Sequence, residues 1–146
     1  MKKLFPLFIF ALFAIVACND DDKKVPLDSS VVQFIESKYP GAQIRHSEYS
    51  DNGLIEVDIL HNSIMKEVYF SKANKWEYTS WDVSLSEVPS VVVNAVNTAY
   101  PDFRIDDVDY IERENALYYE FELEKGGADI YVNVTPEGEI LNNNKN

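Results

Sequence analysis

Apolar and polar residues follow two periods along this chain, and the same order of periods occurs twice. Residues 31–44 read VVQFIESKYPGAQI and residues 91–105 read VVVNAVNTAYPDFRI. Each stretch places apolar residues at helical spacing and then reaches a Tyr-Pro pair, Tyr39-Pro40 or Tyr100-Pro101, which ends a helix. An isoleucine follows each proline at the same distance. The pattern predicts one unit, duplicated in tandem.

Strand-like alternation with period two follows each predicted helix. In the first unit we expect strands at 43–49, 54–60, 66–71 and 74–83, with a hairpin turn at Asp51-Asn52-Gly53. In the second unit we expect strands at 104–112, 116–124, 128–135 and 139–142. The first unit has Lys72-Ala73-Asn74 where the second closes with Pro136-Glu137-Gly138, so its turn lacks a glycine.

The predicted helices have different starting signals. Asp28 and the two serines after it supply N-cap candidates for the first helix. Ser86 is the N-cap candidate for the second helix, and Pro89 fits its first turn. The valines at 91–93 would suit a strand. We still expect a helix there, because Val88, Val92 and Val96 line one helical face.

These elements predict an α+β domain, in which both helices pack on one face of an antiparallel sheet. We expect a leader at 1–17, a tether at 18–25 and one domain at 26–146, made of repeats 26–84 and 85–146. Neither repeat holds enough apolar area to fold stably alone.

The chain has 146 residues and is acidic, with a formal net charge of −12. Such a surface repels nucleic acid and anionic lipid headgroups, so nucleic acid is excluded as a partner and a basic or neutral one is favoured. The alternative is that the acidity only maintains solubility.

The first residues resemble a bacterial lipoprotein signal. Lys2-Lys3 precedes an apolar run from Leu4 to Ala17, which is too short to span a bilayer. Ile15-Val16-Ala17-Cys18 then resembles a lipobox, in which the cysteine is acylated. An ordinary secretory signal with an incidental cysteine is the alternative. Cys18 is the sole cysteine, so acylation leaves no thiol for a disulfide or for catalysis.

Residues 19–24 read NDDDKK, contain no apolar side chain and predict a solvated tether. An acidic run directly after the lipidated cysteine resembles the surface-export signal of some Gram-negative lipoproteins. We therefore expect an exported protein that touches a membrane only through its lipid. The outer membrane or cell surface is favoured over the inner membrane, and retention on the periplasmic side stays open.

The order of leader, helix, Tyr-Pro and strands resembles the PepSY-like proteins, and more narrowly their secreted, putative β-lactamase-inhibitor-like group. The strands that carry the resemblance read IEVDI and EVYF in the first unit and YEFEL and IYVNV in the second, with TPEGEI as the closing turn. The resemblance covers nearly all of the chain after the leader. It implies the fold and a noncatalytic binding or inhibitory module, without catalytic residues or a cofactor.

Motifs for catalysis are not found in the sequence: it has no phosphate loop, no nucleophile elbow and no HExxH. If Asn52-Gly53 is a two-residue loop, His46 faces Ile59 and His61 faces Ile44. The two rings are then diagonal neighbours on the apolar face, about 7–8 Å apart. Two histidines are too few ligands for a metal site, and we interpret them as packed side chains.

Carboxylates cluster in two places. Asp106, Asp107 and Asp109 could bind Ca²⁺ loosely, but a solvated charged strand explains them better. Glu120 and Glu122 share one face and could mimic the carboxyl pair of a glycosidase. We therefore name no metal site and no catalytic residue.

The sheet face without helices is the candidate binding surface. Tyrosine and tryptophan supply contact area at low entropy cost, and carboxylates select a basic or hydroxyl-rich partner. A solvated face with no ligand is the simpler interpretation. The residues expected there are Glu56, Asp58, Tyr69, Glu77, Trp81, Tyr118, Glu120, Glu122, Tyr131 and Asn133.

The leading hypothesis is a lipid-anchored, noncatalytic module that holds a protein or peptide on this face. Two other classes stay open: a carbohydrate-acting hydrolase with paired carboxylates, and a structural component of the envelope.

Overall fold

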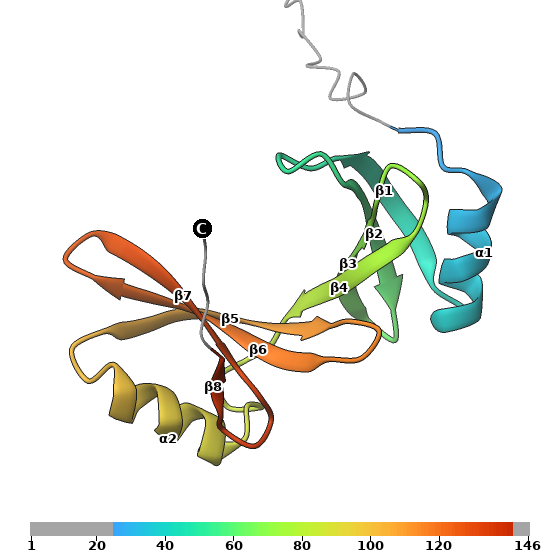
Figure 1. The fold of residues 1–146 in the computed structure, drawn as a ribbon. Coiled ribbons are helices and arrows are strands. Elements are labelled where there is room, and N and C mark those ends of the chain that lie inside the picture. The colour runs from blue at the N-terminus through green and yellow to red at the C-terminus, as the bar shows by residue number, and fades with distance from the viewer. Residues whose placement is uncertain (1–24, 142–146) are drawn as a thin grey trace, which may run out of the picture.

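The computed structural model describes residues 25–141, which form two helices and one eight-stranded sheet (Figure 1). The α+β class is confirmed. In chain order the elements are α1 (Ser29–Lys38), β1 (Gln43–Tyr49), β2 (Ile55–His61), β3 (Ile64–Phe70), β4 (Trp76–Asp82), α2 (Ser90–Ala99), β5 (Arg104–Glu112), β6 (Leu117–Lys125), β7 (Ala128–Val134) and β8 (Ile140–Leu141).

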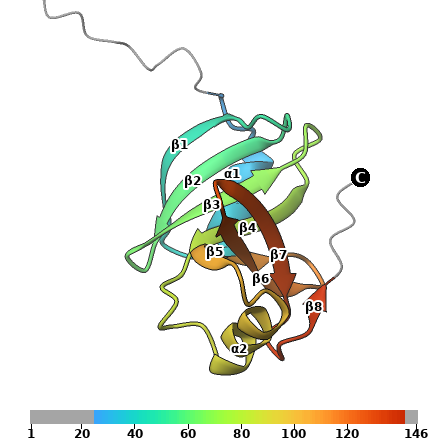
Figure 2. The same cartoon turned by 90° about the vertical axis from the view of Figure 1, so that its left-hand side faces the viewer.

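The strands lie in the sheet in the same order as in the sequence, and each pairs antiparallel with the next. Hairpin turns make every connection except the one from β4 to β5, which runs through α2. The sheet is strongly twisted and bends between its halves, and each half carries one helix (Figures 1 and 2). The β4–β5 ladder, from Thr79–Glu112 to Asp82–Asp109, joins the two halves.

The two helices begin differently but end in the same way. Asp28 caps α1 by accepting a 2.8 Å hydrogen bond from the Ser30 amide. The expectation that Ser86 caps α2 is wrong: the N-cap is Pro89, and no side chain caps this end. At their carboxyl ends the helices agree, because the amides of Tyr39 and Tyr100 each bond the carbonyl four residues back before the proline.

Each helix buries one face on its own half of the sheet. Val31 and Ile35 of α1 pack against apolar side chains of β2 and β3, and Val92 and Val96 of α2 pack against those of β5 to β7. Strand pairing connects these two clusters across the sheet, because directly opposed residues point to the same side. One such row of opposed residues reads Val57, Val68, Thr79, Glu112.

The side chains of the two Tyr-Pro tyrosines lie in unlike surroundings, although their backbones match closely. Tyr39 is buried, and its hydroxyl hydrogen-bonds Thr79 at 2.8 Å and Glu112 at 3.0 Å. Tyr100 is half-buried and packs edge-on against Phe103, with 6.0 Å between ring centroids. The repeats therefore share a chain path, while the first tyrosine has an added role at the junction of the halves.

The closing turns of the two repeats are equally tight, although only the second has a glycine. In the second, the Gly138 amide bonds the Thr135 carbonyl at 2.9 Å. In the first, the Asn74 amide bonds the Ser71 carbonyl at 2.8 Å. Asn74 reaches this geometry at φ 61°, in the left-handed region that asparagine tolerates better than most residues.

The predicted pairing of the two histidines is wrong. The β1–β2 connection is longer than two residues, since Tyr49 pairs with Ile55, and a bulge lies between Ile44 and His46. His46 consequently pairs with Asp58 instead of Ile59, and its ring nitrogen lies 3.8 Å from a Glu48 oxygen. His61 instead lies beside Tyr39, with 5.5 Å between ring centroids. No shared site of the two rings results.

Candidate functional site

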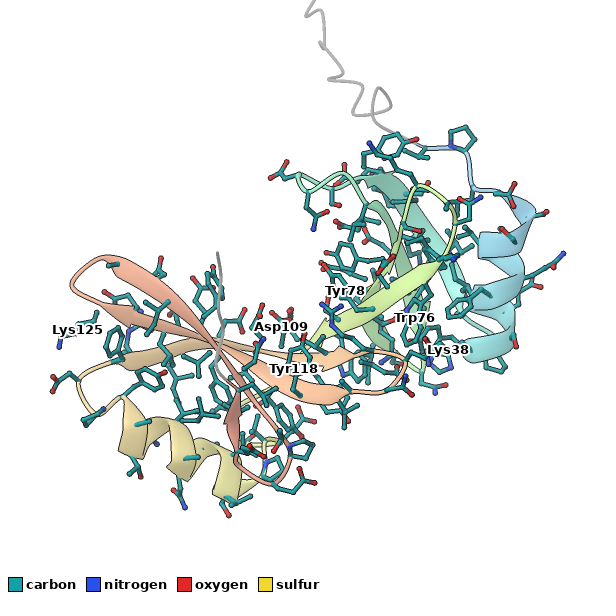
Figure 3. The ribbon with its side chains drawn as sticks, in the orientation of Figure 1. Lys38, Trp76, Tyr78, Asp109, Tyr118 and Lys125 are labelled. Atoms are coloured by element: carbon teal, nitrogen blue, oxygen red, sulfur yellow. The ribbon has the colours of Figure 1, made fainter. Side chains whose placement is uncertain are left out.

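The face of the sheet opposite the helices lies on the inside of the bend, and we call it the open face (Figure 1). Tyr78 and Asp109 point into this inner side, whereas Lys38 and Trp76 lie on the side of α1 (Figure 3). By strand pairing the open face carries His46, Glu48, Glu56, Asp58, Glu67, Tyr69, Tyr78, Ser80, Asp82, Asp107, Asp109, Ile111, Tyr118, Glu120, Glu122, Tyr131 and Asn133.

Carboxylates stand directly opposite one another across this face. The opposed pairs are Glu48–Glu56, Asp58–Glu67, Asp82–Asp109, Asp109–Glu120 and Asp107–Glu122. Like charges in directly opposed positions destabilise a sheet by a few tenths of a kcal/mol to about 1 kcal/mol each. Cations that bind here would relieve that repulsion.

An aromatic cluster occupies the middle of the open face. The rings of Tyr69 and Tyr78 are stacked, with centroids 4.3 Å apart. The Arg113 guanidinium lies 4.8 Å from the centroid of Tyr78 and donates to the Tyr118 hydroxyl at 3.1 Å. Tyr69 donates to Glu67 at 2.7 Å. These contacts fix the rings in place, so a partner would meet a preorganised surface.

Three of these acids converge at one side of the cluster. Carboxylate oxygens of Glu56, Asp58 and Glu67 lie within 4.8 Å of one another. Burial and then the charge of Glu67 raise the pKa values of Glu56 and Asp58. Three oxygen ligands are fewer than the six to eight that Ca²⁺ takes, so the trio falls short of a calcium site by itself.

Asp82 and Asp109 form a second acidic pair where the two halves of the sheet meet. They are register partners on β4 and β5. Burial, a hydrogen bond with Asp82 and the charge of Asp82 raise the pKa of Asp109 to about 7. The two carboxyl groups therefore share a proton at mildly acidic pH.

Most of the predicted face residues lie on the open face, but Trp81 and Glu77 do not follow the prediction. Trp81 pairs with Tyr110 on the helix-bearing face, and the two ring centroids lie 4.6 Å apart. Glu77 is exposed within a bulge between Trp76 and Tyr78 and has no register partner. The sequence does not show which residues of β4 face the helices, because its aromatic residues fall on both alternating positions.

Sequence reasoning missed Glu67, Tyr78, Asp82 and Lys66. The first three gave no local signal, because their significance depends on which strands become neighbours. Lys66 did give one: it stands at an apolar position of the alternation Lys66, Val68, Phe70, and it is 8% exposed. A lysine at an apolar position of a strand is as unusual as a buried acid, and the sequence alone shows it.

The three aspartates of β5 do not form a common site. Asp106 pairs with Arg104, Asp107 accepts from the Val108 amide at 2.9 Å, and Asp109 faces Asp82. Cys18 and the tether lie outside the described residues. Neither of the two helices in residues 25–141 has the length and apolar character of a membrane span.

The chain is similar to known proteins both in sequence and in fold. The sequence profile of the family described as "Putative beta-lactamase-inhibitor-like, PepSY-like" matches residues 54–142. No curated protein matches the chain in sequence.

Solved structures from Bacteroides share the fold. A BLIP-like protein from Bacteroides fragilis is 22% identical, with 85% of this chain and 89% of that chain covered and a TM-score of 0.71. A DUF2874 family protein from Bacteroides uniformis is 21% identical, with 80% and 88% covered and a TM-score of 0.68. A putative periplasmic protein from Bacteroides eggerthii is 22% identical, with 81% and 88% covered and a TM-score of 0.66.

Proposed function

Because this chain belongs to the family described as putative beta-lactamase-inhibitor-like, PepSY-like, we propose that it is a noncatalytic binding module of the cell envelope. It holds a protein or peptide on the open face of its sheet. The main support is the position of that face, which is free of helices, lies inside the bend and carries fixed tyrosines among opposed carboxylates.

Charge and aromatic content together favour a protein or peptide with basic groups. Opposed carboxylates repel each other until a cation lies between them. A bound basic group would therefore remove a repulsion that destabilises the free sheet. The Tyr69–Tyr78 stack offers a rigid apolar contact beside Glu56 and Glu67. Tyrosines with fixed rings bind at low entropy cost.

Capture experiments with charge-reversed variants test this proposal. Glu120→Lys combined with Glu122→Lys reverses two open-face charges, and we expect at least a tenfold loss of captured partner from envelope extract. Glu36→Lys combined with Glu137→Lys makes the same change in net charge at exposed sites on α1 and in the β7–β8 turn, and should capture normally. Equal capture by both double variants would remove the open face as the binding surface.

A purified beta-lactamase is a second probe, chosen from the family description. Inhibition by the full chain that is lost with the Glu120 and Glu122 reversals would identify an inhibitor. Binding without inhibition would support a binding module and contradict an inhibitory role.

Paired carboxylates raise one further candidate, acid–base hydrolysis of a carbohydrate, and Asp82 and Asp109 are the closest such pair to test it on. Glycosidase carboxyl groups lie about 5–9.5 Å apart so that the sugar or a water fits between them. Asp82 and Asp109 instead hydrogen-bond each other, which suits proton sharing better than attack on a glycosidic bond. Release of reducing sugar by the natural chain, abolished in Asp109→Asn, would establish the enzyme.

Export and lipid attachment at Cys18 belong to the same proposal. The lipobox-like sequence before Cys18 supports it, as does the structural neighbour called a putative periplasmic protein. Labelled palmitate should be incorporated into the natural chain and not into Cys18→Ser. Incorporation into both would show that the cysteine is not the acceptor.

We also infer that the two halves arose by duplication. The matched backbones of Tyr39 and Tyr100 and the identical bonding of the turns at Asn74 and Gly138 support this. Separate expression of residues 26–84 and 85–146 should give two fragments that fold only when mixed.

A further inference from the structure

An apolar pocket lies beside the point where the described residues begin. Val25, Pro26 and Leu27 form one wall of it, and Ile44 and Ser47 of β1 form the other. Its volume is about 370 Å³, and none of the residues that line it is ionisable. In a chain with a formal net charge of −12, a surface pocket without ionisable groups favours an apolar ligand.

Two hydrogen bonds hold Val25 on the outer edge of the sheet. The Val25 amide donates to the Ser47 carbonyl at 2.9 Å, and the Ser47 hydroxyl donates to the Val25 carbonyl at 2.7 Å. The chain before Val25 therefore joins the domain at a fixed point of β1, beside the pocket. Because the Ser47 hydroxyl donates its proton within the protein, the pocket offers a ligand mainly apolar contact.

The pocket lies on the helix-bearing side of β1, away from the open face. Ile44 pairs with Ile59, which belongs to the core under α1, and directly opposed residues point to the same side of a sheet. Ile44 is nevertheless 39% exposed, because β1 is the outermost strand. Pro26 is exposed as well. Both side chains can therefore enter an apolar phase without any change in the core.

The short distance in sequence between Cys18 and Val25 selects the occupant. Val25 follows Cys18 by seven residues, so even a fully extended chain keeps it within about 25 Å of that cysteine. A linker this short holds two groups at an effective concentration on the order of millimolar. If Cys18 carries acyl chains in a membrane, even a weak apolar contact keeps the pocket against that membrane. A soluble ligand or a second copy of the chain has no such advantage.

The charge of the domain restricts the lipid to a neutral one. An acidic surface is repelled by anionic headgroups, whereas the pocket itself carries no charge. Apolar surfaces that bind a bilayer from one side enter it by about 5–10 Å, at the boundary between headgroups and acyl chains. A neutral membrane surface therefore fits the pocket and tolerates the charge of the domain around it.

We propose that the pocket formed by residues 25–27, Ile44 and Ser47 docks on the neutral lipid surface that holds the acyl chains of Cys18. This inference rests on the proposed function, because it requires the lipid anchor. It adds a second contact with the membrane to the one expected from the lipid. Docking by this edge of β1 keeps the open face clear of the bilayer, since the pocket lies on the opposite side of the strand.

Relaxation of amide NMR signals by a paramagnetic lipid tests the docking. Cys18 is the sole cysteine, so a maleimide-linked phospholipid can be attached to the mature chain, residues 18–146, whether or not the cell acylates it. The anchored chain is placed in phosphatidylcholine nanodiscs with and without a lipid whose headgroup binds gadolinium. We expect the strongest relaxation enhancement at residues 25–27 and 44–47.

Matched substitutions of two exposed isoleucines separate docking from simple tethering. Ile44→Asp places a charge in the pocket and should lower the enhancement at residues 44–47 at least threefold. Ile64→Asp makes the same change at an isoleucine of β3 that is 44% exposed, and should leave that enhancement unchanged. Pro26→Asp charges the other wall of the pocket and should act like Ile44→Asp. Circular dichroism and melting of each variant show whether it is folded.

Full enhancement at residues 44–47 in folded Ile44→Asp and Pro26→Asp, or an enhancement centred on another segment, would overturn the docking. A dimer of the unlipidated chain that Ile44→Asp disrupts, with no effect of this variant in nanodiscs, would also overturn it and assign the pocket to a second copy. Palmitate labelling in cells distinguishes this failure from failure of the proposed function. If Cys18 is acylated and the anchored chain does not dock, only the role of the pocket is wrong.

Discussion

The Tyr39 hydroxyl lies 3.0 Å from a carboxylate oxygen of Glu112, and this contact joins the two halves of the molecule. Tyr39 follows the helix of the first repeat, and Glu112 ends the first strand of the second. Lys38 adds an ion pair to the other oxygen of Glu112 at 2.7 Å. The Trp76 indole donates to Thr79 at 3.0 Å, which extends the network into β4.

Tyr39→Phe should therefore destabilise the protein by about 1–2 kcal/mol, because it removes the hydrogen bonds that the Tyr39 hydroxyl makes with Thr79 and with one oxygen of Glu112. Tyr100→Phe is the matched control from the second repeat. The Tyr100 hydroxyl has no hydrogen bond within residues 25–141, and its removal should cost less than about 0.5 kcal/mol. Urea unfolding measures both changes. Equal costs for the two variants would contradict the role of the network.

Asp109→Asn should change how stability depends on pH. The folded pKa of Asp109 is raised to about 7, above the unfolded value, so the folded state holds a proton that the unfolded chain has lost. Stability therefore falls as pH rises from about 4 to about 7. Asp82, Asp107 and Glu67 all face this group and repel its charge.

The asparagine variant should be more stable than the natural chain at pH 8 by on the order of 1 kcal/mol, a melting shift of about 3–5 °C, after allowance for solvent screening. The difference should shrink towards pH 4, where the folded state of the natural chain no longer carries the charge of Asp109. Melting curves of both proteins from pH 4 to pH 8 test this. A constant gap over that range would place the cause elsewhere.

Lys66→Met should stabilise the protein at neutral pH. Burial lowers the pKa of Lys66 to about 8, so the folded state bears the cost of a desolvated charge at pH 7. Because that cost disappears as pH rises from 8 to 10.5, the advantage of methionine should shrink over the same range. We expect about 1 kcal/mol at pH 7, since the lost contact with Trp81 offsets part of the gain.

Denaturant unfolding at pH 7 and pH 10 checks the sign of the Lys66 effect. A stabilised variant would mean that the desolvation of the Lys66 ammonium outweighs its contact with Trp81. A destabilised variant would mean that the contact between Lys66 and Trp81 outweighs the desolvation.

Gly138→Ala should destabilise the closing turn of the second repeat by about 2 kcal/mol. Gly138 has φ +87°, and a Cβ there would lie 3.0 Å from the Val91 carbonyl oxygen of α2. Gly126→Ala supplies the control, since Gly126 has φ +63° and nothing within 4 Å of its Cβ position. It should cost about 1 kcal/mol from backbone conformation alone. The difference between the two, measured by thermal unfolding, isolates the contact with Val91.

The sequence by itself determined the local elements and the α+β class. Strands 43–49 and 104–112 have the predicted bounds, and both helices end at their Tyr-Pro pairs. These features depend on short-range physics: the alternation of side chains, the Asp28 cap, and the loss of an amide at proline. The family resemblance rested on the same patterns and is confirmed.

The tertiary structure alone decided which set of alternate residues in each strand faces the helices. It also decided which acidic residues become neighbours. A one-residue change of register turns a side chain to the opposite face of a sheet, so the longer β1–β2 turn separated the two histidines. Ambiguous alternation in β4 hid the position of Trp81. Asp82 meets Asp109 only because β4 pairs with β5 across the helix α2, 27 residues apart in sequence. No local pattern encodes such a pairing, because it depends on how two separate apolar surfaces are buried in one sheet.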